Sequence, residues 1–346
     1  MPHYKNVALE ARAHSLPPEW LTSSEIEQKL APLYERLKLP EGRLELMTGV
    51  DKRGYWPVGT APSTIATQAA SKLIETNGID PESIDLLIFS SVCRDFLEPA
   101  SASVVHANLK LSPRTQIFDL SNACLGVLSA TQMASNLIEL GHFKRVLIVS
   151  GENAGPLLTN TLNQLENDPK ITRKSIKKYI ANLTIGSAGL AWLIGSTASA
   201  PHAPRIIGGV GQTDSSANHL CRGDGDAQGL MMQTDSEALL EHGIRLAKNN
   251  WKAFCDDLEL ENEQIDYVVG HQVGSAHERM VLGALELDKK KTTVTYPWLG
   301  NTGSAALPLT LDYLEKEHSL NKGDVMALLG IGSGLTSLIM GIEWNH

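Results

Sequence analysis

The chain has few aromatic residues, few cysteines and no long unbroken apolar run. Aromatic residues make up 5% of its 346 residues, and its four cysteines stand far apart, without the spacing of a disulfide framework or a metal site. The N-terminal Met-Pro-His-Tyr-Lys-Asn lacks the apolar core of a signal peptide. The longest uncharged run, residues 325–342, is broken by glycines and predicts two buried strands around a turn, not a membrane span. These absences predict a protein of the reducing cytoplasm.

The chain also has fewer basic residues than acidic ones, 30 against 39. The net charge of −9 argues against a nucleic-acid surface and against docking on anionic lipid. The densest basic stretch, residues 170–178, is typical of a solvated helix face or loop; the alternative is that it contacts the phosphates of a carrier such as coenzyme A. The sequence shows no metal-ligand pattern and no Gly-x-Gly-x-x-Gly between a strand and a helix. We therefore expect no metal and no bound cofactor.

What the sequence does contain is an internal repeat. Residues 78–89 resemble residues 258–269, because in both a helix precedes an acidic turn and an Ile-Asp pair opens an apolar strand. Residues 144–151 resemble residues 323–330, again about 180 residues apart. Apolar strands that alternate with helices predict mostly parallel sheets covered on both faces. We predict two duplicated α/β halves, residues 1–200 and 201–346, stacked as helix, sheet, helix, sheet, helix.

Cys124 stands at a predicted corner between a strand and a helix. Phe118–Leu120 is typical of a strand end, and Leu125–Leu137 predicts a helix rich in small and apolar residues. The N–H groups at a helix N-terminus lower the pKa of a thiol and bind an oxyanion, and a thiolate is a strong nucleophile. A cysteine taken alone is more often a small buried apolar residue than a nucleophile. Other residues near Cys124 are therefore needed to distinguish these two interpretations.

Two further polar residues are expected near this corner. His271 directly follows the apolar strand 267–270, which places it at the edge where open α/β sheets bind ligands. Asn301 lies in the turn Gly-Asn-Thr-Gly, which the repeat of about 180 residues puts opposite Cys124. For each residue alone, the alternatives are a satisfied core histidine and a plain turn. His277 is expected to point to solvent.

A glycine-rich segment, residues 330–334, ends another buried strand. Such a segment leaves backbone N–H groups free, so the amide of Ser333 and that of Cys124 are candidates for the two arms of an oxyanion hole.

These residues resemble the 3-oxoacyl-ACP synthase III family of the thiolase superfamily. The resemblance rests on Asn-Ala-Cys at 122–124, His-Gln at 271–272, Asn-Thr-Gly-Ser-Ala-Ala at 301–306 and the terminal Gly-Ser-Gly-Leu-Thr, and it runs from about residue 6 to residue 344. It implies a homodimer with the thiolase-like five-layered αβαβα fold and a Cys-His-Asn site that joins acyl thioesters through a carbon–carbon bond. Thiolases proper carry a second catalytic cysteine where this chain has Ser333.

A finer resemblance, to the OleA-type enzymes that condense long-chain acyl-CoA, covers residues 33–37, 40–44, 92–100 and 121–126. It implies that Glu98 reaches into the active site of the partner subunit. A malonyl donor forms its carbanion by losing CO₂, whereas a second plain acyl-CoA must give an α-proton to a base. Glu98 is predicted to be that base; the alternative is a residue that merely favours a helix start. Met47 departs from the family, because many of its members carry an arginine near coenzyme A at this place.

The resemblance implies a cytoplasmic, homodimeric acyltransferase of lipid metabolism. Cys124 accepts an acyl group, the amides of Cys124 and Ser333 hold the oxyanion, and His271 and Asn301 stabilise the enolate of a second thioester. Glu98 of the partner subunit assists its deprotonation, and a 3-oxoacyl product results. Coenzyme A or acyl carrier protein thioesters are the substrates. The alternatives are a decarboxylating 3-oxoacyl-ACP synthase III that uses malonyl-ACP in fatty acid biosynthesis, a thioester hydrolase and a non-catalytic subunit of a synthase.

Overall fold

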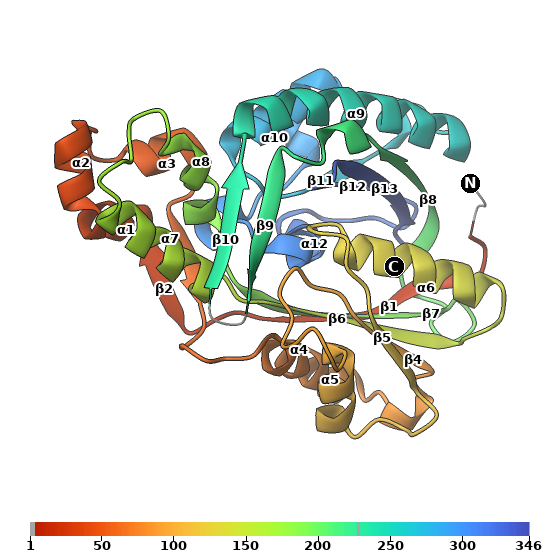
Figure 1. Cartoon of the computed structure of the whole chain (residues 1–346). Coiled ribbons are helices and arrows are strands. Elements are labelled where there is room, and N and C mark those ends of the chain that lie inside the picture. Colours follow the sequence, from red (N-terminus) through yellow and green to blue (C-terminus); the bar gives the residue numbers. More distant parts are fainter. Residues whose placement is uncertain (1–3, 227–228, 346) are drawn as a thin grey trace.

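The computed structural model describes residues 4–226 and 229–345. Its main sheet has nine strands in the order β11-β12-β13-β8-β1-β7-β6-β4-β5. Their bounds are β1 Val7–Ser15, β4 Leu86–Phe89, β5 Gln116–Asp119, β6 Arg145–Glu152, β7 Ala188–Ser196, β8 Arg205–Thr213, β11 Tyr267–Gly270, β12 Val325–Gly332 and β13 Thr336–Glu343. One residue pair, Ala8 opposite Arg205, joins β1 to β8, and there the sheet folds into two stacked parts (Figure 1).

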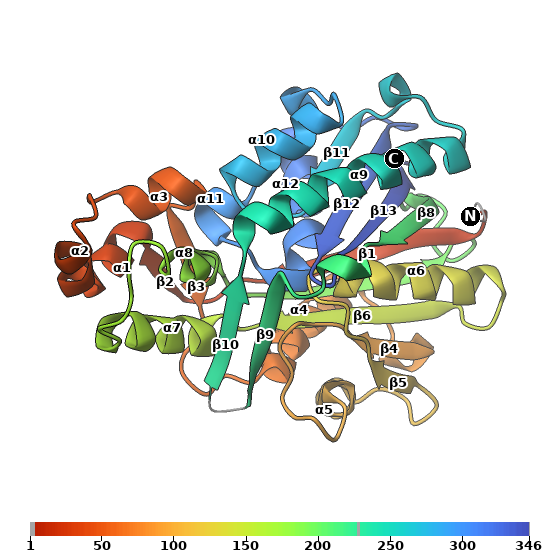
Figure 2. The same cartoon turned by 45° about the horizontal axis from the view of Figure 1, so that its top comes forward.

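Six helices complete the layers. The helices α4 (Pro62–Asn77) and α5 (Ser101–Leu109) cover the outer face of the part that runs from β5 to β1, and α9 (Ser236–Leu258) and α10 (Ser275–Ala284) cover the outer face of the other. Between the two parts lie α6 (Gly126–Glu139) and α12 (Ala306–Glu317), each of which contacts strands of both (Figure 2). The predicted five-layered order is therefore confirmed.

The packing explains the composition of the central helices. A helix enclosed by sheets is apolar nearly all round, and α12 is buried from Ala306 to Asp312 and again at Leu314. On α6 the buried side chains are small or aliphatic, including Val127, Leu128 and Ala130. Together with the inward faces of both sheets these helices form the largest hydrophobic core. Among the described residues, no helix is both long enough and apolar enough to cross a membrane.

The remaining elements form a lobe to one side of the layers (Figure 1). They are α1 Ser23–Lys29, α2 Ala31–Leu37, α3 Arg43–Thr48, α7 Gly155–Asn167, α8 Lys177–Ile180, α11 Tyr296–Leu299, the pair β2 Glu19–Thr22 and β3 Lys52–Tyr55, and the hairpin β9 Cys221–Asp226 and β10 Gly229–Thr234. Short 3₁₀ turns are η1 Pro81–Ser83, η2 Asn182–Thr184, η3 Ser215–Ala217, η4 Asn262–Gln264, η5 Lys289–Lys291 and η6 Gly303–Ala305. An apolar cluster of α1, α2, α7 and α8 residues holds this lobe together.

The internal repeat has a structural counterpart. Asp85 accepts hydrogen bonds from the N–H groups of Lys144 and Arg145 at 2.7 and 3.0 Å, and Asp266 accepts one from Val325 at 2.8 Å. Each aspartate belongs to one of the repeated Ile-Asp pairs, and each caps the start of the central strand of its own half. The predicted division near residue 200 lies in the connection between β7 and β8.

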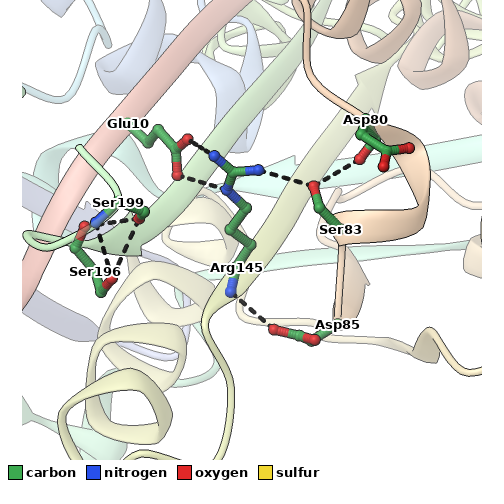
Figure 3. A network of polar contacts seen from close by, with 7 residues as sticks. All are labelled: Glu10, Asp80, Ser83, Asp85, Arg145, Ser196 and Ser199. Carbon is green, nitrogen blue, oxygen red and sulfur yellow. Dashed lines mark hydrogen bonds and ion pairs between the residues drawn. The ribbon is translucent and has the colours of Figure 1, made fainter.

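A polar network fixes the start of β6. The guanidinium group of Arg145 donates to both carboxylate oxygens of Glu10 at 3.1 and 2.6 Å, and to the hydroxyl of Ser83 at 2.8 Å (Figure 3). Glu10 lies at the irregularity of β1 between Leu9 and Ala11. A bidentate pair of this kind fixes the relative position and orientation of its two side chains. The network therefore ties β1, β6 and the turn before β4 together at the end of β6 that is remote from Cys124.

Candidate active site

Cys124 lies at the turn between β5 and α6, as the sequence predicts. Ala123 has a φ of +47°, a left-handed conformation that is uncommon for residues other than glycine. The N–H groups of Leu125 and Gly126 donate to the carbonyls of Asn122 and Ala123 at 2.9 and 3.1 Å. This tight turn places the thiol just before the first residue of α6.

The end of β12 packs directly on this turn. A Cβ atom added to Gly330 would lie 2.4 Å from Cδ2 of Leu125, and one added to Gly332 would lie 3.2 Å from its Cγ. A side chain at either position would have to displace Leu125, so the two glycines let the end of β12 pack closely on this turn. The turn that holds Ser333 therefore lies next to Cys124. His271 joins the same edge, since its N–H donates to the carbonyl of Leu329 at 3.1 Å.

The loop that carries Asn301 reaches the corner from the other half of the repeat. A Cβ atom added to Gly126 would lie 3.3 Å from the Cβ of Ser304. The Oδ1 atom of Asn301 accepts a hydrogen bond from the N–H of Gly303 at 3.0 Å, and its backbone N–H donates to Thr184 at 2.9 Å. The equivalent corners of the two halves thus meet, and Cys124, His271 and Asn301 gather on the loops that surround the meeting point.

Glu152 is a buried carboxylate in this site that the sequence analysis missed. It accepts hydrogen bonds from the N–H groups of Val92 and Cys93 at 2.9 and 3.3 Å, and from the N–H and hydroxyl of Ser304 at 3.0 and 2.6 Å. It therefore joins the loop that leads to Glu98 to the loop that follows Asn301. The sequence does hold one signal for this residue: Glu152 is a charged residue at the end of the otherwise apolar strand β6.

The protonation states differ from the sequence prediction. The pKa of Cys124 is raised to about 12; burial is the largest cause, the charge of Glu152 and the thiol of Cys221 add to it, and the backbone N–H at Cys124 acts in the opposite direction. The backbone N–H lowers the pKa of the thiol, as expected, but burial outweighs it, so the pKa of Cys124 is raised and not lowered. Burial also lowers the pKa of His271 to about 3, with His277 as the second cause. The resting site holds a neutral thiol and a neutral imidazole.

The prediction that His277 points to solvent is also wrong. His277 is half-buried, lines a cavity together with His271, and burial lowers its pKa to about 4. The physical reason is the packing of α10 on the second half of the sheet, which the residue pattern of this short helix does not reveal.

Glu98 lies in an exposed loop of this chain. The N–H groups of Val92 and Cys93 anchor the loop on Glu152, while Phe96 and Leu97 near its tip are 48% and 94% exposed. Over residues 4–226 and 229–345, no hydrogen bond or ion pair connects Glu98 to the loops around Cys124. A single chain therefore does not bring Glu98 together with the other predicted site residues.

Comparison with known proteins identifies the family. Residues 118–164 match the family model "3-Oxoacyl-[acyl-carrier-protein (ACP)] synthase III", and residues 255–344 match the model of its C-terminal part. Proteins named acyl-CoA:acyl-CoA alkyltransferase from Shewanella oneidensis and Xanthomonas campestris pv. campestris are 37% and 36% identical, each over 99% of both chains. The chain belongs to the OleA-type branch of the 3-oxoacyl-ACP synthase III family. A beta-ketoacyl-ACP synthase III from Clostridium tetani is 27% identical over 87% of this chain and 89% of its own.

Solved structures agree with this OleA-type assignment. A cysteine-to-alanine variant of Xanthomonas campestris OleA superposes with a TM-score of 0.94 at 35% identity, covering 99% of this chain and 98% of that one. A cysteine-to-serine variant with bound lauric acid and lauroyl-CoA gives 0.93, again at 35% identity, and covers 99% and 100%. The predicted family and the predicted thiolase-like fold are both confirmed.

Glu152→Ala should destabilise this OleA-type protein markedly. The change leaves the N–H groups of Val92, Cys93 and Ser304 without their acceptor, and each loss costs about 1–3 kcal/mol. We expect the free energy of unfolding to fall by roughly 3–5 kcal/mol, as measured by urea denaturation. The matched control is Glu139→Ala, because the half-buried Glu139 also accepts hydrogen bonds, from Lys5 and Asn6 at the surface. Similar losses in both variants would contradict the bracing role of Glu152.

Proposed function

We propose that this protein is an acyltransferase that joins two long-chain acyl-CoA molecules in a Claisen condensation without decarboxylation. The observation that carries the proposal is the meeting of the Cys124 turn with the loops of His271 and Asn301. The chain shares this arrangement with a family in which full-length relatives, 37% and 36% identical, are named acyl-CoA:acyl-CoA alkyltransferases. The product is a 3-oxoacyl compound.

In the first step the sulfur of Cys124 attacks the thioester carbonyl of one acyl-CoA. A carbon–sulfur bond forms to the protein, the bond to the coenzyme A sulfur breaks, and coenzyme A leaves with the proton of the thiol. The oxyanion forms in front of the N–H groups of Cys124 and Ser333, which act as donors. Because the pKa of the thiol is raised to about 12, proton loss has to accompany the attack.

In the second step a carboxylate removes an α-proton from the second acyl-CoA. We assign this role to Glu98 of the partner subunit, while His271 and Asn301 stabilise the enolate oxygen. The enolate carbon attacks the acyl-Cys124 carbonyl, so that a carbon–carbon bond forms, the carbon–sulfur bond breaks and Cys124 regains a proton. The exposure of Glu98 in one chain supports a role in the site of another.

A homodimer supplies that second chain. The strand β5 is an edge strand of the main sheet, its Ile117 is 37% exposed, and Phe96 and Leu97 are exposed as well. Exposed edge strands and apolar patches are covered by partners in native proteins. We propose that a second copy of this chain covers them. Four unpaired cysteines support a cytoplasmic location.

A basic pocket supports coenzyme A as the carrier. Lys38, Arg43, Arg173 and Lys177 line a pocket of about 110 Å³ between α2, α3 and α8. Two of these residues belong to the basic stretch 170–178 of the sequence. Clustered guanidinium and ammonium groups bind phosphates well, so we propose that this pocket receives the phosphates of coenzyme A. The reaction as written needs no further cofactor and no metal.

The test is incubation of the protein with one long-chain acyl-CoA and no malonyl thioester. We expect a protein mass increased by one acyl group and a 3-oxo product that consumes two acyl-CoA molecules. A product that appears only with malonyl-ACP, together with CO₂, would replace the proposal with the decarboxylating reaction. Free fatty acid without a carbon–carbon product would indicate a hydrolase, and the lack of any adduct would indicate a non-catalytic subunit.

A further inference from the structure

A small cavity lies behind His271. It has a volume of about 40 Å³ and is enclosed by β11, β12, α9 and α10, which lie side by side in Figure 2. Most of its wall is apolar, but His271, His277, Glu278 and Tyr296 contribute polar atoms. A cavity of this size with several polar partners is large enough to hold water.

The cavity adjoins a nitrogen that needs a partner. His271 is 8% exposed, and its Nδ1 atom has no hydrogen bond to any residue in the described part of the chain. A buried nitrogen without a partner costs stability. A neutral imidazole carries its proton on one nitrogen only, so whatever bonds to Nδ1 decides whether Nε2 donates.

The other polar side chains near Nδ1 already have partners. Gln272 donates to the carbonyl of Gly270 at 2.8 Å and accepts from the N–H groups of Thr295 and Tyr296 at 2.8 and 3.2 Å. The Oε2 atom of Glu278 accepts from the hydroxyl of Tyr296 at 2.6 Å, and its Oε1 atom lies 3.3 Å from the ammonium group of Lys289. The hydroxyl of Ser337, which also lines the cavity, accepts from the amide of Asn250 at 3.0 Å. His277, the third residue of α10, remains as the polar ring that lines the same cavity as His271.

We propose that His277 is a positioning residue, which donates through a water in this cavity toward Nδ1 of His271 and so keeps the proton of His271 on Nε2. The inference rests on the proposed function, in which Nε2 must donate to the enolate oxygen of the second thioester. Burial keeps both rings neutral near pH 7, because it lowers the pKa of His277 to about 4 and that of His271 to about 3. His277 thereby acts on the condensation step and not on the acylation of Cys124.

The test compares His277→Phe, which removes the donor, with His277→Gln, which keeps one. With a long-chain acyl-CoA, His277→Phe should slow release of the 3-oxo product about 10- to 100-fold, the usual effect of losing a partner behind a functional histidine. Acylation of Cys124, followed by intact mass, should stay within about twofold, and His277→Gln should recover most of the condensation rate. The control is His142→Phe at an exposed position after α6, which should change neither rate.

A second readout does not depend on turnover. The ¹⁵N shifts of His271 should show the proton on Nε2 in the wild type and a mixture of tautomers in His277→Phe. Unchanged condensation and unchanged shifts in His277→Phe would overturn the proposal, and so would equal losses in both variants and both steps. If the wild type makes no 3-oxo product, the proposed function fails, while the ¹⁵N shifts still decide whether His277 sets the tautomer.

Discussion

Replacing Cys124 with alanine is expected to abolish acylation of the protein and to lower the rate of 3-oxo product formation by roughly 10⁴-fold or more, because a covalent route loses its nucleophile. The thiol is the atom that both steps of the proposed reaction share: it receives the first acyl group and later releases it. Intact mass spectrometry after incubation with a long-chain acyl-CoA measures the first effect, and product analysis measures the second.

Cys255→Ala is the matched control for this prediction. Cys255 is also a half-buried free thiol, and burial raises its pKa to about 11. It lies near the C-terminal end of α9, however, where its thiol donates to Oδ1 of Asn262 at 3.9 Å. The variant should keep the adduct and the activity. An acyl adduct that persists in Cys124→Ala, or that disappears in Cys255→Ala, would show that the nucleophile has been assigned to the wrong residue.

Glu98→Gln should separate the two steps of the reaction. The amide has nearly the shape of the carboxylate but cannot take an α-proton, and loss of a general base costs about 10²- to 10⁴-fold in rate. We expect acylation of Cys124 to proceed, the acyl-protein to accumulate, and the 3-oxo product to form at a rate lower by that factor. Time courses of adduct and product in the same reaction measure both quantities.

Mixed dimers test whether Glu98 acts across the interface. When Cys124→Ala and Glu98→Gln chains are unfolded together and refolded, a mixed dimer has one site with an intact cysteine and an intact glutamate from the partner. Random pairing in a two-fold dimer should then restore about one quarter of the wild-type activity. If the mixture stays as inactive as its components although mixed dimers form, Glu98 acts within its own chain or not at all.

Much of the fold follows from local patterns in the sequence. The Ile-Asp pairs at 84–85 and 265–266 predict the parallel strands β4 and β11, and the glycine-broken run 325–342 predicts the hairpin of β12 and β13. The position of His271 directly after β11 follows in the same way. These features were predictable because each depends on residues that are neighbours in the chain.

What the sequence did not reveal depends on packing between distant segments. Glu152 becomes a brace only because Val92 and Ser304 come within hydrogen-bond reach of it. The raised pKa of Cys124 and the lowered pKa of His277 both arise chiefly from burial, which depends on packing between segments that are distant in the sequence. The N–H group at Cys124 still lowers the pKa of the thiol, but burial outweighs it.

The corners of Cys124 and Ser304, which meet at the centre of the molecule, are equivalent in the repeat but differ in their roles. Positions 124 and 304, and likewise 152 and 332, are related by the repeat of about 180 residues. On one side Cys124 carries a thiol, and Gly332 packs against the neighbouring Leu125; on the other side the buried hydroxyl of Ser304 lies within hydrogen-bond distance of Glu152 and of the carbonyl of Ser90. The repeat thus gives two equivalent corners. In this chain the corner of Cys124 carries the proposed nucleophile, and the corner of Ser304 supports it structurally.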